Sequence, residues 1–267
     1  MYQAAYDRVK AARGGDRPTG VDYIRNIFKG FFECHGDRRY GDDKAVVGGI
    51  ARLGKMSVTV IAVEKGHTAK ERGYRNFGAP GPEGYRKALR LMKQADKFGR
   101  PIICFVDTSG AACGVGAEER GQGLAIAENL MEMSTLSVPV ISLFIGEGGS
   151  GGALALAMAD RVWMLENAVY SVISPEGCAS ILWKDAQQAA AVAESLKLTA
   201  QDARALGVAE RVISEKEIGT REFYRDIRRQ LAEEIRQLCG DVDLIAHRYE
   251  RFRRIGIPWS SRGVFDE

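Results

Sequence analysis

The chain has 267 residues, 45% of them apolar, which is enough for one large domain or two small ones with a substantial core. Its formal net charge is only +3, and no stretch reaches the roughly 18 to 20 uncharged apolar residues of a membrane-spanning helix. The first 17 residues are polar and lack the apolar centre of a signal peptide, so we expect a cytoplasmic protein that does not enter a membrane.

The cysteines and histidines give no sign of a metal site or a disulfide framework. The five cysteines are odd in number, widely scattered and never in the C-x-x-C spacing of a zinc ribbon. The three histidines have no partner ligand at a useful spacing. We therefore expect no bound metal.

In chain order, the first predicted elements are a helical N-terminal segment over residues 1–30 and a β-hairpin. Two β-rich runs, residues 45–53 and 58–64, are separated by a Gly-Lys pair that is typical of a tight turn. Residues 82–98 carry apolar side chains at helical spacing, with a proline at the start and a glycine just beyond the end, and predict a helix.

Residues 64–100 form the most basic part of the chain, with ten Lys or Arg residues against four acidic ones. Such a run is usually a solvated helix face, although it could also face an anionic substrate. Nucleic acid is a third reading, but no binding motif and no interleaved aromatic platform accompany these residues. We therefore expect no nucleic-acid partner.

Beyond this helix the chain repeats a strand-loop-helix plan. Residues 101–106 are continuously apolar, which is typical of a strand buried on both faces. A loop at residues 107–116 and a helix at residues 118–134 follow it. Residues 138–145 form a second apolar run of the same kind.

A glycine-rich run at residues 146–152 follows that second strand, with five glycines in seven positions before a helix expected at residues 150–159. Glycines let a ligand approach the backbone, and a helix start leaves several N–H groups without an intrahelical partner. Such a turn suits a phosphate cradle or an oxyanion hole. A P-loop is excluded because Ala153 and Leu154 stand where Lys and Ser or Thr would be needed.

Two other readings of the glycine run stay open. Residues 148–152 fit G-x-S-x-G, the nucleophile elbow of a serine hydrolase, with Ser150 as nucleophile and His247 as base. The run could also serve only to let a helix pack closely on a strand.

The remaining segments predict two short strands and then helices. The strands fall at residues 161–165 and 169–173, and the helices at residues 175–183, 185–196, 199–206, 217–239 and 241–254. Strand-strand-helix repeats resemble the pattern of the crotonase-like superfamily, so we expect an α/β spiral of such repeats with helical additions at both ends.

Several separated motifs carry a resemblance to a known family. They are F-E-C-H-G-D-R at 32–38, D-D at 42–43 with A-V-V-G-G at 45–49, R-N-F-G at 75–78, P-E-G-Y-R-K-A-L-R-L-M at 82–92, G-A-E-E-R-G-Q at 116–122, the glycine run, and Y-S-V-I-S-P-E-G-C-A-S-I-L-W-K-D at 170–185. Together they closely resemble the carboxyltransferase alpha subunits of bacterial acetyl-CoA carboxylases, over about residues 20–215.

The resemblance implies a function and its partners. A carboxyl group would pass from carboxybiotin on a carrier protein to acetyl-CoA, giving malonyl-CoA for fatty acid biosynthesis. The implied partners are a zinc-ribbon beta subunit, the biotin carboxyl carrier protein and biotin carboxylase, in a hetero-oligomer expected to be alpha2beta2, with no covalently bound cofactor. The domains would be an N-terminal segment (1–30), a carboxyltransferase domain (31–215) and a C-terminal helical extension (216–267).

The resemblance also implies the site residues. A backbone oxyanion hole would come from Gly148, Gly149, Gly151 and Gly152. Substrate binding would involve Gly110, Ala111, Ala112, Gly114, Val115, Gly116 and Ala153. No side-chain base is strictly needed, because the ureido nitrogen of biotin can take the methyl proton, and this agrees with a site built from backbone N–H groups.

One loop departs from the family pattern. The usual D-T-P-G-A-Y-P-G reads D-T-S-G-A-A-C-G at residues 107–114, with Ser109, Ala112 and Cys113 replacing two prolines and a tyrosine. The change leaves open a related biotin-dependent carboxyltransferase or decarboxylase subunit with another acyl preference.

Overall fold

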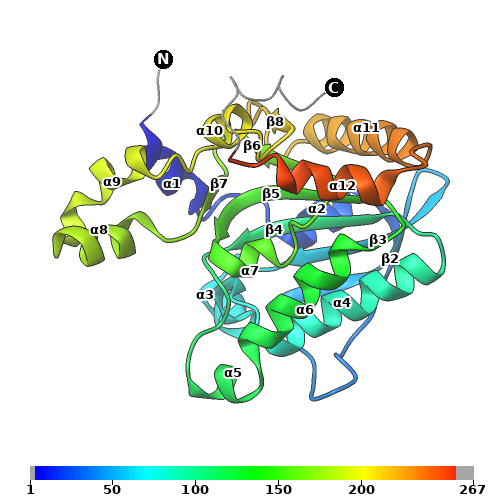
Figure 1. Ribbon diagram of the computed structural model, residues 1–267, viewed down its shortest axis with the longest axis horizontal. Helices are drawn as coiled ribbons and strands as arrows, with labels where there is room; N and C mark the ends of the chain where they lie inside the picture. Colours follow the sequence, from blue (N-terminus) through cyan, green and yellow to red (C-terminus); the bar gives the residue numbers. More distant parts are fainter. Residues whose placement is uncertain (1–3, 257–267) are drawn as a thin grey trace.

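Apolar runs form the centre of an eight-stranded sheet in the computed structural model, which describes residues 4–256 (Figure 1). The strands are β1 Lys29–Glu33, β2 Val46–Leu53, β3 Met56–Val63, β4 Ile102–Thr108, β5 Val140–Gly149, β6 Arg161–Leu165, β7 Val169–Ser171 and β8 Arg211–Ile213. Their order is β1-β2-β3-β4-β5-β6-β8, and β7 pairs with the end of β5. β1 to β3 are antiparallel neighbours, whereas all later pairs are parallel.

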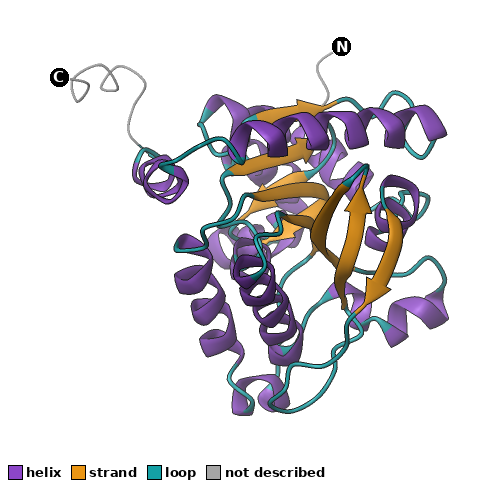
Figure 2. Ribbon diagram, turned by 90° about the vertical axis from the view of Figure 1, so that its right-hand side faces the viewer, coloured by secondary structure: helices purple, strands orange, loops and turns teal. Residues whose placement is uncertain are grey.

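Helices cover both faces of the sheet (Figure 2). They are α1 Ala5–Ala12, α2 Gly20–Ile27, α3 Ala69–Tyr74, α4 Pro82–Lys97, α5 Val115–Glu119, α6 Gln122–Ser134, α7 Ser150–Leu154, α8 Pro175–Trp183, α9 Ala189–Ser195, α10 Ala200–Ala205, α11 Arg221–Leu238 and α12 Leu244–Arg253, with 3₁₀ turns at Asn76–Gly78 and Ala186–Gln188. The α8–α9 pair projects away from the sheet, at the left of Figure 1.

The hairpin, the long helix and the first buried strand are confirmed. Leu53 pairs with Met56, so the predicted Gly-Lys pair forms a two-residue turn, and Gly54 has a φ of 64°. α4 ends two residues before Gly99, whose φ of 63° lies in the left-handed region. Every residue of β4 is buried, as its unbroken apolar pattern predicts.

Several predicted boundaries are wrong. The helix expected at residues 118–134 is two helices, because Gly121 adopts a φ of 82° between them. The glycine run does not form a turn along its whole length: β5 continues to Gly149, where it pairs with β7, and α7 is only five residues long. β1 and β8 have no counterpart in the prediction.

The terminal helices share the core of the sheet. One continuous cluster of buried apolar side chains includes Tyr23 of α2, Phe105 of β4 and Ile227 of α11. The rings of Tyr23 and Phe105 lie 5.3 Å apart between centroids. The predicted N-terminal and C-terminal segments thus contribute to one core where they are described, while residues 1–3 and 257–267 lie outside the described residues.

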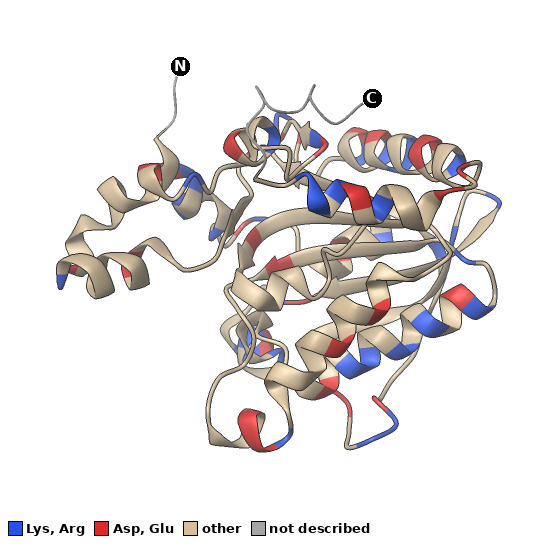
Figure 3. Ribbon diagram, viewed as in Figure 1, with Lys and Arg blue, Asp and Glu red and all other residues tan. Residues whose placement is uncertain are grey.

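Part of the basic segment is paired with acidic residues within the fold. Lys87 is buried and lies 2.6 Å from the Asp42 carboxylate, Arg86 pairs with Asp37 at 2.7 Å, and Lys93 links α4 to α6 through Glu132 at 2.7 Å. Figure 3 shows basic residues along α4 and acidic residues on the neighbouring α6. Among the described residues, Lys65, Arg86, Lys87 and Lys93 form ion pairs and the other six basic residues of the segment do not, so a role in binding an anion stays a prediction. Across residues 4–256, no helix has both the length and the apolarity to cross a bilayer.

Arg248 anchors α12 to the start of the central strands. It is 1% exposed, and all five of its N–H groups have acceptors. Two of these N–H groups donate to the Asp160 carboxylate, each at 2.8 Å. The other three donate to the carbonyl groups of Met133, Leu136 and Val138. Asp160 in turn accepts the N–H of Val140 at 2.7 Å.

Replacing Arg248 with Met should therefore lower the free energy of unfolding by about 3 to 5 kcal/mol, because Asp160 would stay buried without its counter-charge. Urea unfolding measures this loss, and R248M/D160N should recover part of it. Arg229, whose ion pairs within α11 are exposed, supplies the control R229M, which should leave the midpoint nearly unchanged. Equal effects of R248M and R229M would contradict a structural role for the buried pair.

Candidate functional site

The loops that follow β4 and β5 meet at the carboxyl ends of these parallel strands. Thr108, the last residue of β4, pairs with Gly148 near the end of β5. Ser109 and Gly110 therefore lie beside Gly149, and α7 begins directly after it. In parallel α/β sheets, this edge is where ligands bind.

The glycines are required for space at this junction. A Cβ on Gly149 would collide with the Ser109 carbonyl group, and one on Gly152 would lie 2.5 Å from the Ala111 nitrogen and 2.8 Å from the Tyr85 hydroxyl oxygen. Gly151 differs, because its nearest neighbour would be a methyl group of Ile126 at 3.7 Å. Gly149 and Gly152 thus allow a close contact, but with the loop that follows β4 rather than between a helix and a strand, as the close-packing alternative expected.

Three backbone N–H groups near this contact have no hydrogen-bond acceptor. Within the described residues, these are the N–H groups of Ala111, Gly151 and Gly152. The last two belong to the first turn of α7, where intrahelical acceptors are missing. Both segments at the contact therefore carry unpaired backbone donors, which an oxyanion hole needs.

Side-chain and backbone hydrogen bonds hold the β4 loop and α7 in place. The Thr108 hydroxyl donates to the Gly110 carbonyl group at 2.7 Å, and the Ala112 N–H donates to the Pro80 carbonyl group at 2.9 Å. The Tyr85 hydroxyl donates to the Gly152 carbonyl group at 3.1 Å. Burial, and to a lesser extent Asp43, raises the pKa of Tyr85 well above its usual range, so this hydroxyl stays a donor.

The predicted site residues fall into two groups. Gly110 lies against Gly149, and Ala111 lies against Gly152. The roles proposed for Gly110, Ala111, Ala112, Gly148, Gly149, Gly151, Gly152 and Ala153 stay predictions. Gly114, Val115 and Gly116 instead lead into α5, which packs against α6; Val115 is 76% exposed, and a Cβ on Gly114 would meet nothing within 4 Å. Their role in substrate binding stays a prediction.

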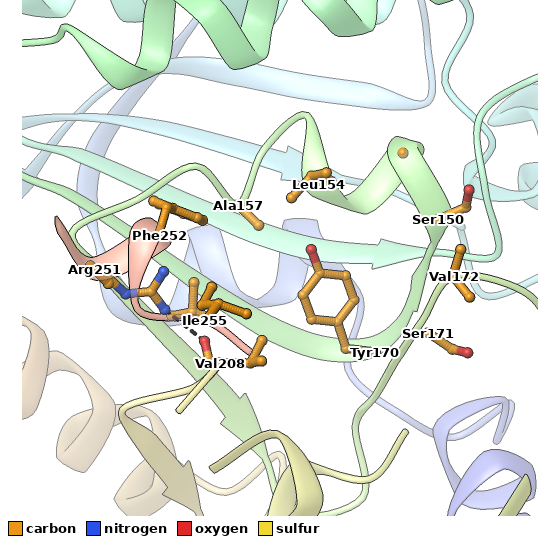
Figure 4. A pocket seen from close by; sticks show the side chains of 12 residues that line it. Ser150, Leu154, Ala157, Tyr170, Ser171, Val172, Val208, Arg251, Phe252 and Ile255 are labelled. Carbon is orange, nitrogen blue, oxygen red and sulfur yellow. Dashed lines mark hydrogen bonds between the residues drawn. The ribbon is translucent and has the colours of Figure 1, made fainter. Parts of the chain in front are cut away.

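Ser150 lies at the mouth of an apolar cavity of about 400 Å³ (Figure 4). Leu154, Tyr170, Val208 and Phe252 line it, and burial raises the pKa of Tyr170 to about 12. Ser150 has a φ of 53°, which is unusual for a residue with a side chain. His247, its proposed base in a hydrolase, is exposed and pairs with Asp241 at 2.8 Å instead.

Four charged residues beside the two loops were not predicted. Arg13, which follows α1, Lys65, which follows β3, Asp107 of β4 and Glu147 of β5 form consecutive ion pairs. Lys65 belongs to the basic run at residues 64–100, Asp107 directly follows an apolar run and Glu147 interrupts the glycines, but nothing in the sequence pairs them. In the described part of the chain, no three His, Cys, Asp or Glu side chains are grouped as a metal site would require.

The family model and the curated relatives that match this chain point to the same family. The family model described as acetyl co-enzyme A carboxylase carboxyltransferase-like matches residues 2–256. The chain is 61% identical over 257 residues to the acetyl-coenzyme A carboxylase carboxyl transferase subunit alpha of Ruminiclostridium cellulolyticum, covering 95% of this chain and 98% of the relative. It is 55% identical to the subunits beta/alpha protein of Natranaerobius thermophilus, covering 94% of this chain and 42% of that protein.

Solved structures confirm the crotonase-like fold. A transcarboxylase 12S chain with methylmalonyl-coenzyme A bound superposes with a TM-score of 0.69 at 24% identity, over 84% of this chain and 42% of that one. A Pseudomonas malonate decarboxylase hetero-tetramer chain superposes with a TM-score of 0.70 at 20% identity, over 89% of this chain and 98% of that one. This chain therefore spans less than half of the transcarboxylase chain.

Two alanine substitutions should separate the glycines that are needed for space from those that are not. G149A should lower the melting temperature by several degrees, because its methyl group collides with the Ser109 carbonyl group and the loops must part. G151A should leave the melting temperature unchanged or slightly higher, since its site is open and alanine favours a helix. Thermal unfolding followed by circular dichroism tests both, and equal melting temperatures would contradict this account.

Proposed function

Because the chain belongs to the acetyl co-enzyme A carboxylase carboxyltransferase-like family, we propose that it is the alpha subunit of an enzyme that transfers a carboxyl group from carboxybiotin to acetyl-CoA. The product is malonyl-CoA, which serves fatty acid biosynthesis. The observation that carries the proposal is the contact between the Ser109–Ala111 and Gly149–Gly152 backbones, with unpaired N–H groups on both sides.

The chemistry of carboxyl transfer fits a site made of backbone donors. As the N–CO₂ bond of carboxybiotin breaks, negative charge develops on the ureido oxygen. The ureido nitrogen then takes a proton from the methyl group of acetyl-CoA, and the resulting enolate carbon attacks the released CO₂. The N–H groups of Ala111, Gly151 and Gly152 stabilise one of the two developing oxyanions, and we assign them to the ureido oxygen.

Gly148 and Gly149 have a different part in this proposal from the one expected from sequence. Both pair with β7, Gly148 opposite Tyr170 and Gly149 opposite Ser171, and so belong to the sheet. Gly149 shapes the hole by admitting the β4 loop, and Gly148 leaves room for the Phe144 ring, while Gly151, Gly152 and Ala111 supply the donors.

The relatives indicate a beta-subunit partner, because one is named subunit alpha and another joins beta and alpha in one chain. We propose that this partner carries a zinc ribbon and the second oxyanion hole, that the assembly is alpha2beta2, and that biotin arrives on the biotin carboxyl carrier protein after loading by biotin carboxylase. No cofactor would then be covalently bound to this chain, which would work in the cytoplasm. Exposed Ile181, Leu182 and Trp183 on the projecting α8 supply apolar area for such an assembly.

The altered loop favours a second candidate, a related acyl-CoA carboxyltransferase or decarboxylase subunit with a broader acyl preference. Ala112 is smaller than the tyrosine of the family pattern, and if residue 112 lines the acyl site, one added methylene there would change discrimination by only about 1 to 3 kcal/mol. Relative turnover of acetyl-CoA and propionyl-CoA by the assembled enzyme separates the two candidates.

The isolated chain should not form malonyl-CoA from carboxybiotin and acetyl-CoA, and adding the beta subunit should start the reaction. One set of backbone donors cannot stabilise both oxyanions at the same time. Chromatographic detection of malonyl-CoA, with each subunit alone as the control, provides the measurement. Full activity of the isolated chain would rule out a site divided between two subunits.

S150A should change the carboxyl-transfer rate of the complex by no more than about threefold, because transfer uses backbone groups rather than the hydroxyl. Fluorophosphonate labelling of the wild-type chain serves as the parallel test. Labelling at Ser150, together with loss of esterase activity in S150A, would establish the hydrolase reading instead.

A further inference from the structure

Arg13, Lys65, Asp107 and Glu147 form an ionic clamp beside the two loops of the site. The Lys65 ammonium group lies 2.6 Å from Asp107 Oδ1 and 3.1 Å from Glu147 Oε2. Arg13, at the end of α1, lies 2.7 Å from Glu147 Oε1 and also reaches Glu176 of α8 at 2.7 Å. One lysine thus joins the ends of β4 and β5.

The clamp lies where the sheet alone does not fix the spacing of these strands. Val106 pairs with Phe144, but Thr108 pairs with Gly148, so β5 carries two additional residues over this interval. The Asp107 carboxylate compensates by accepting the Glu147 N–H at 2.8 Å, and Gly146 leaves the room that this carboxylate occupies. Asp107 lies two residues before Ser109, and Glu147 lies two residues before Gly149, where the two loops touch.

Charge balance argues against an anion-binding role for the clamp. Two cations, Arg13 and Lys65, face three carboxylates, Asp107, Glu147 and Glu176, so no positive charge remains for a ligand. The polar cavity of about 240 Å³ beside them is also lined by Arg17, which Glu215 neutralises at 2.7 Å, and by Arg72, which donates to the Gly66 carbonyl group at 3.3 Å.

The ionisation states argue against proton transfer. Burial lowers the pKa of Lys65, but Asp107 and Glu147 more than offset this and raise it above its ordinary value. Burial raises the pKa of Glu147, while Lys65 and Arg13 outweigh that effect and leave it below its ordinary value. Near neutral pH Lys65 stays protonated and Glu147 ionised, so Lys65 cannot accept a proton and Glu147 cannot donate one.

We propose that Lys65 is a positioning residue for carboxyl transfer: it binds Asp107 and Glu147 together and so sets the spacing between the backbone donors of Ala111 and of Gly151 and Gly152. The expected effect of Lys65 on the transfer rate depends on the proposed function. Removing Lys65 alone leaves Asp107 without its counter-charge and should also cost some stability, so hydrogen exchange in α11 is needed to separate a global loss of stability from a loss of loop geometry.

The test is K65M in the alpha chain assembled with its beta subunit. We expect kcat to fall by about 10-fold to 100-fold, as displacement of reacting groups by about 1 Å can cause, while KM for acetyl-CoA changes by less than about twofold. K65R should recover most of the activity. K93M, which removes an exposed ion pair with Glu132, is the matched control and should behave as wild type. A wild-type kcat in K65M would overturn the proposal.

Hydrogen exchange supplies a readout that does not depend on activity. K65M should speed exchange in peptides covering residues 108–114 and 146–154 and leave peptides of α11 unchanged. Wild-type exchange in both loops, whatever the kcat, would also overturn the proposal. If wild-type complex transfers no carboxyl group, the proposed function fails, and exchange still decides whether Lys65 orders the loops. If K65M does not assemble, E147Q undergoes the same measurements with the same expected outcomes.

Discussion

The site depends on a contact between two backbone segments that is too close for any side chain between them. The Ser109 carbonyl group occupies the space of a Cβ on Gly149, and the Ala111 nitrogen lies close to that of Gly152. Gly149 of β5 and Gly152 of α7 therefore follow from one geometric requirement. Their φ angles are negative, so their small size matters here and their conformational freedom does not. Because the segments come from adjacent parallel strands, the sheet brings the two sets of donors together.

Carboxylates fix both ends of β5, the strand that leads into the site. At its start, Asp160 accepts the Val140 N–H, and at its end Asp107 accepts the Glu147 N–H. Each carboxylate is neutralised by a cation from a distant part of the chain, Arg248 and Lys65 respectively. The first pair is buried among carbonyl groups and attaches a C-terminal helix, whereas the second lies beside open polar space at the site. Similar chemistry thus serves stability at one end and loop spacing at the other.

Local patterns predicted the elements that depend on local interactions. β4, α4 and the β2–β3 hairpin follow from an apolar run, a helical period and a turn signal. The end of β5 was missed because glycines have low strand propensity, and its pairing with β7 is a longer-range interaction. The ionic clamp could not be found, because Arg13 and Glu147 are 134 residues apart and nothing in the sequence pairs them. The candidate backbone site, by contrast, was predicted from the resemblance of its motifs to a known family.

The altered loop shows how one local geometry can be kept by different residues. Prolines at 109 and 113 would restrict the loop before folding, and this chain lacks both. Its fold instead holds the segment through the Thr108 hydroxyl and the bond from Ala112 to Pro80. Ala111 packs against the cluster of Tyr85, Ala125 and Ala155, so its N–H keeps its place beside Gly152. The chain therefore holds the loop beside Gly152 without either proline, by hydrogen bonds and by the packing of Ala111.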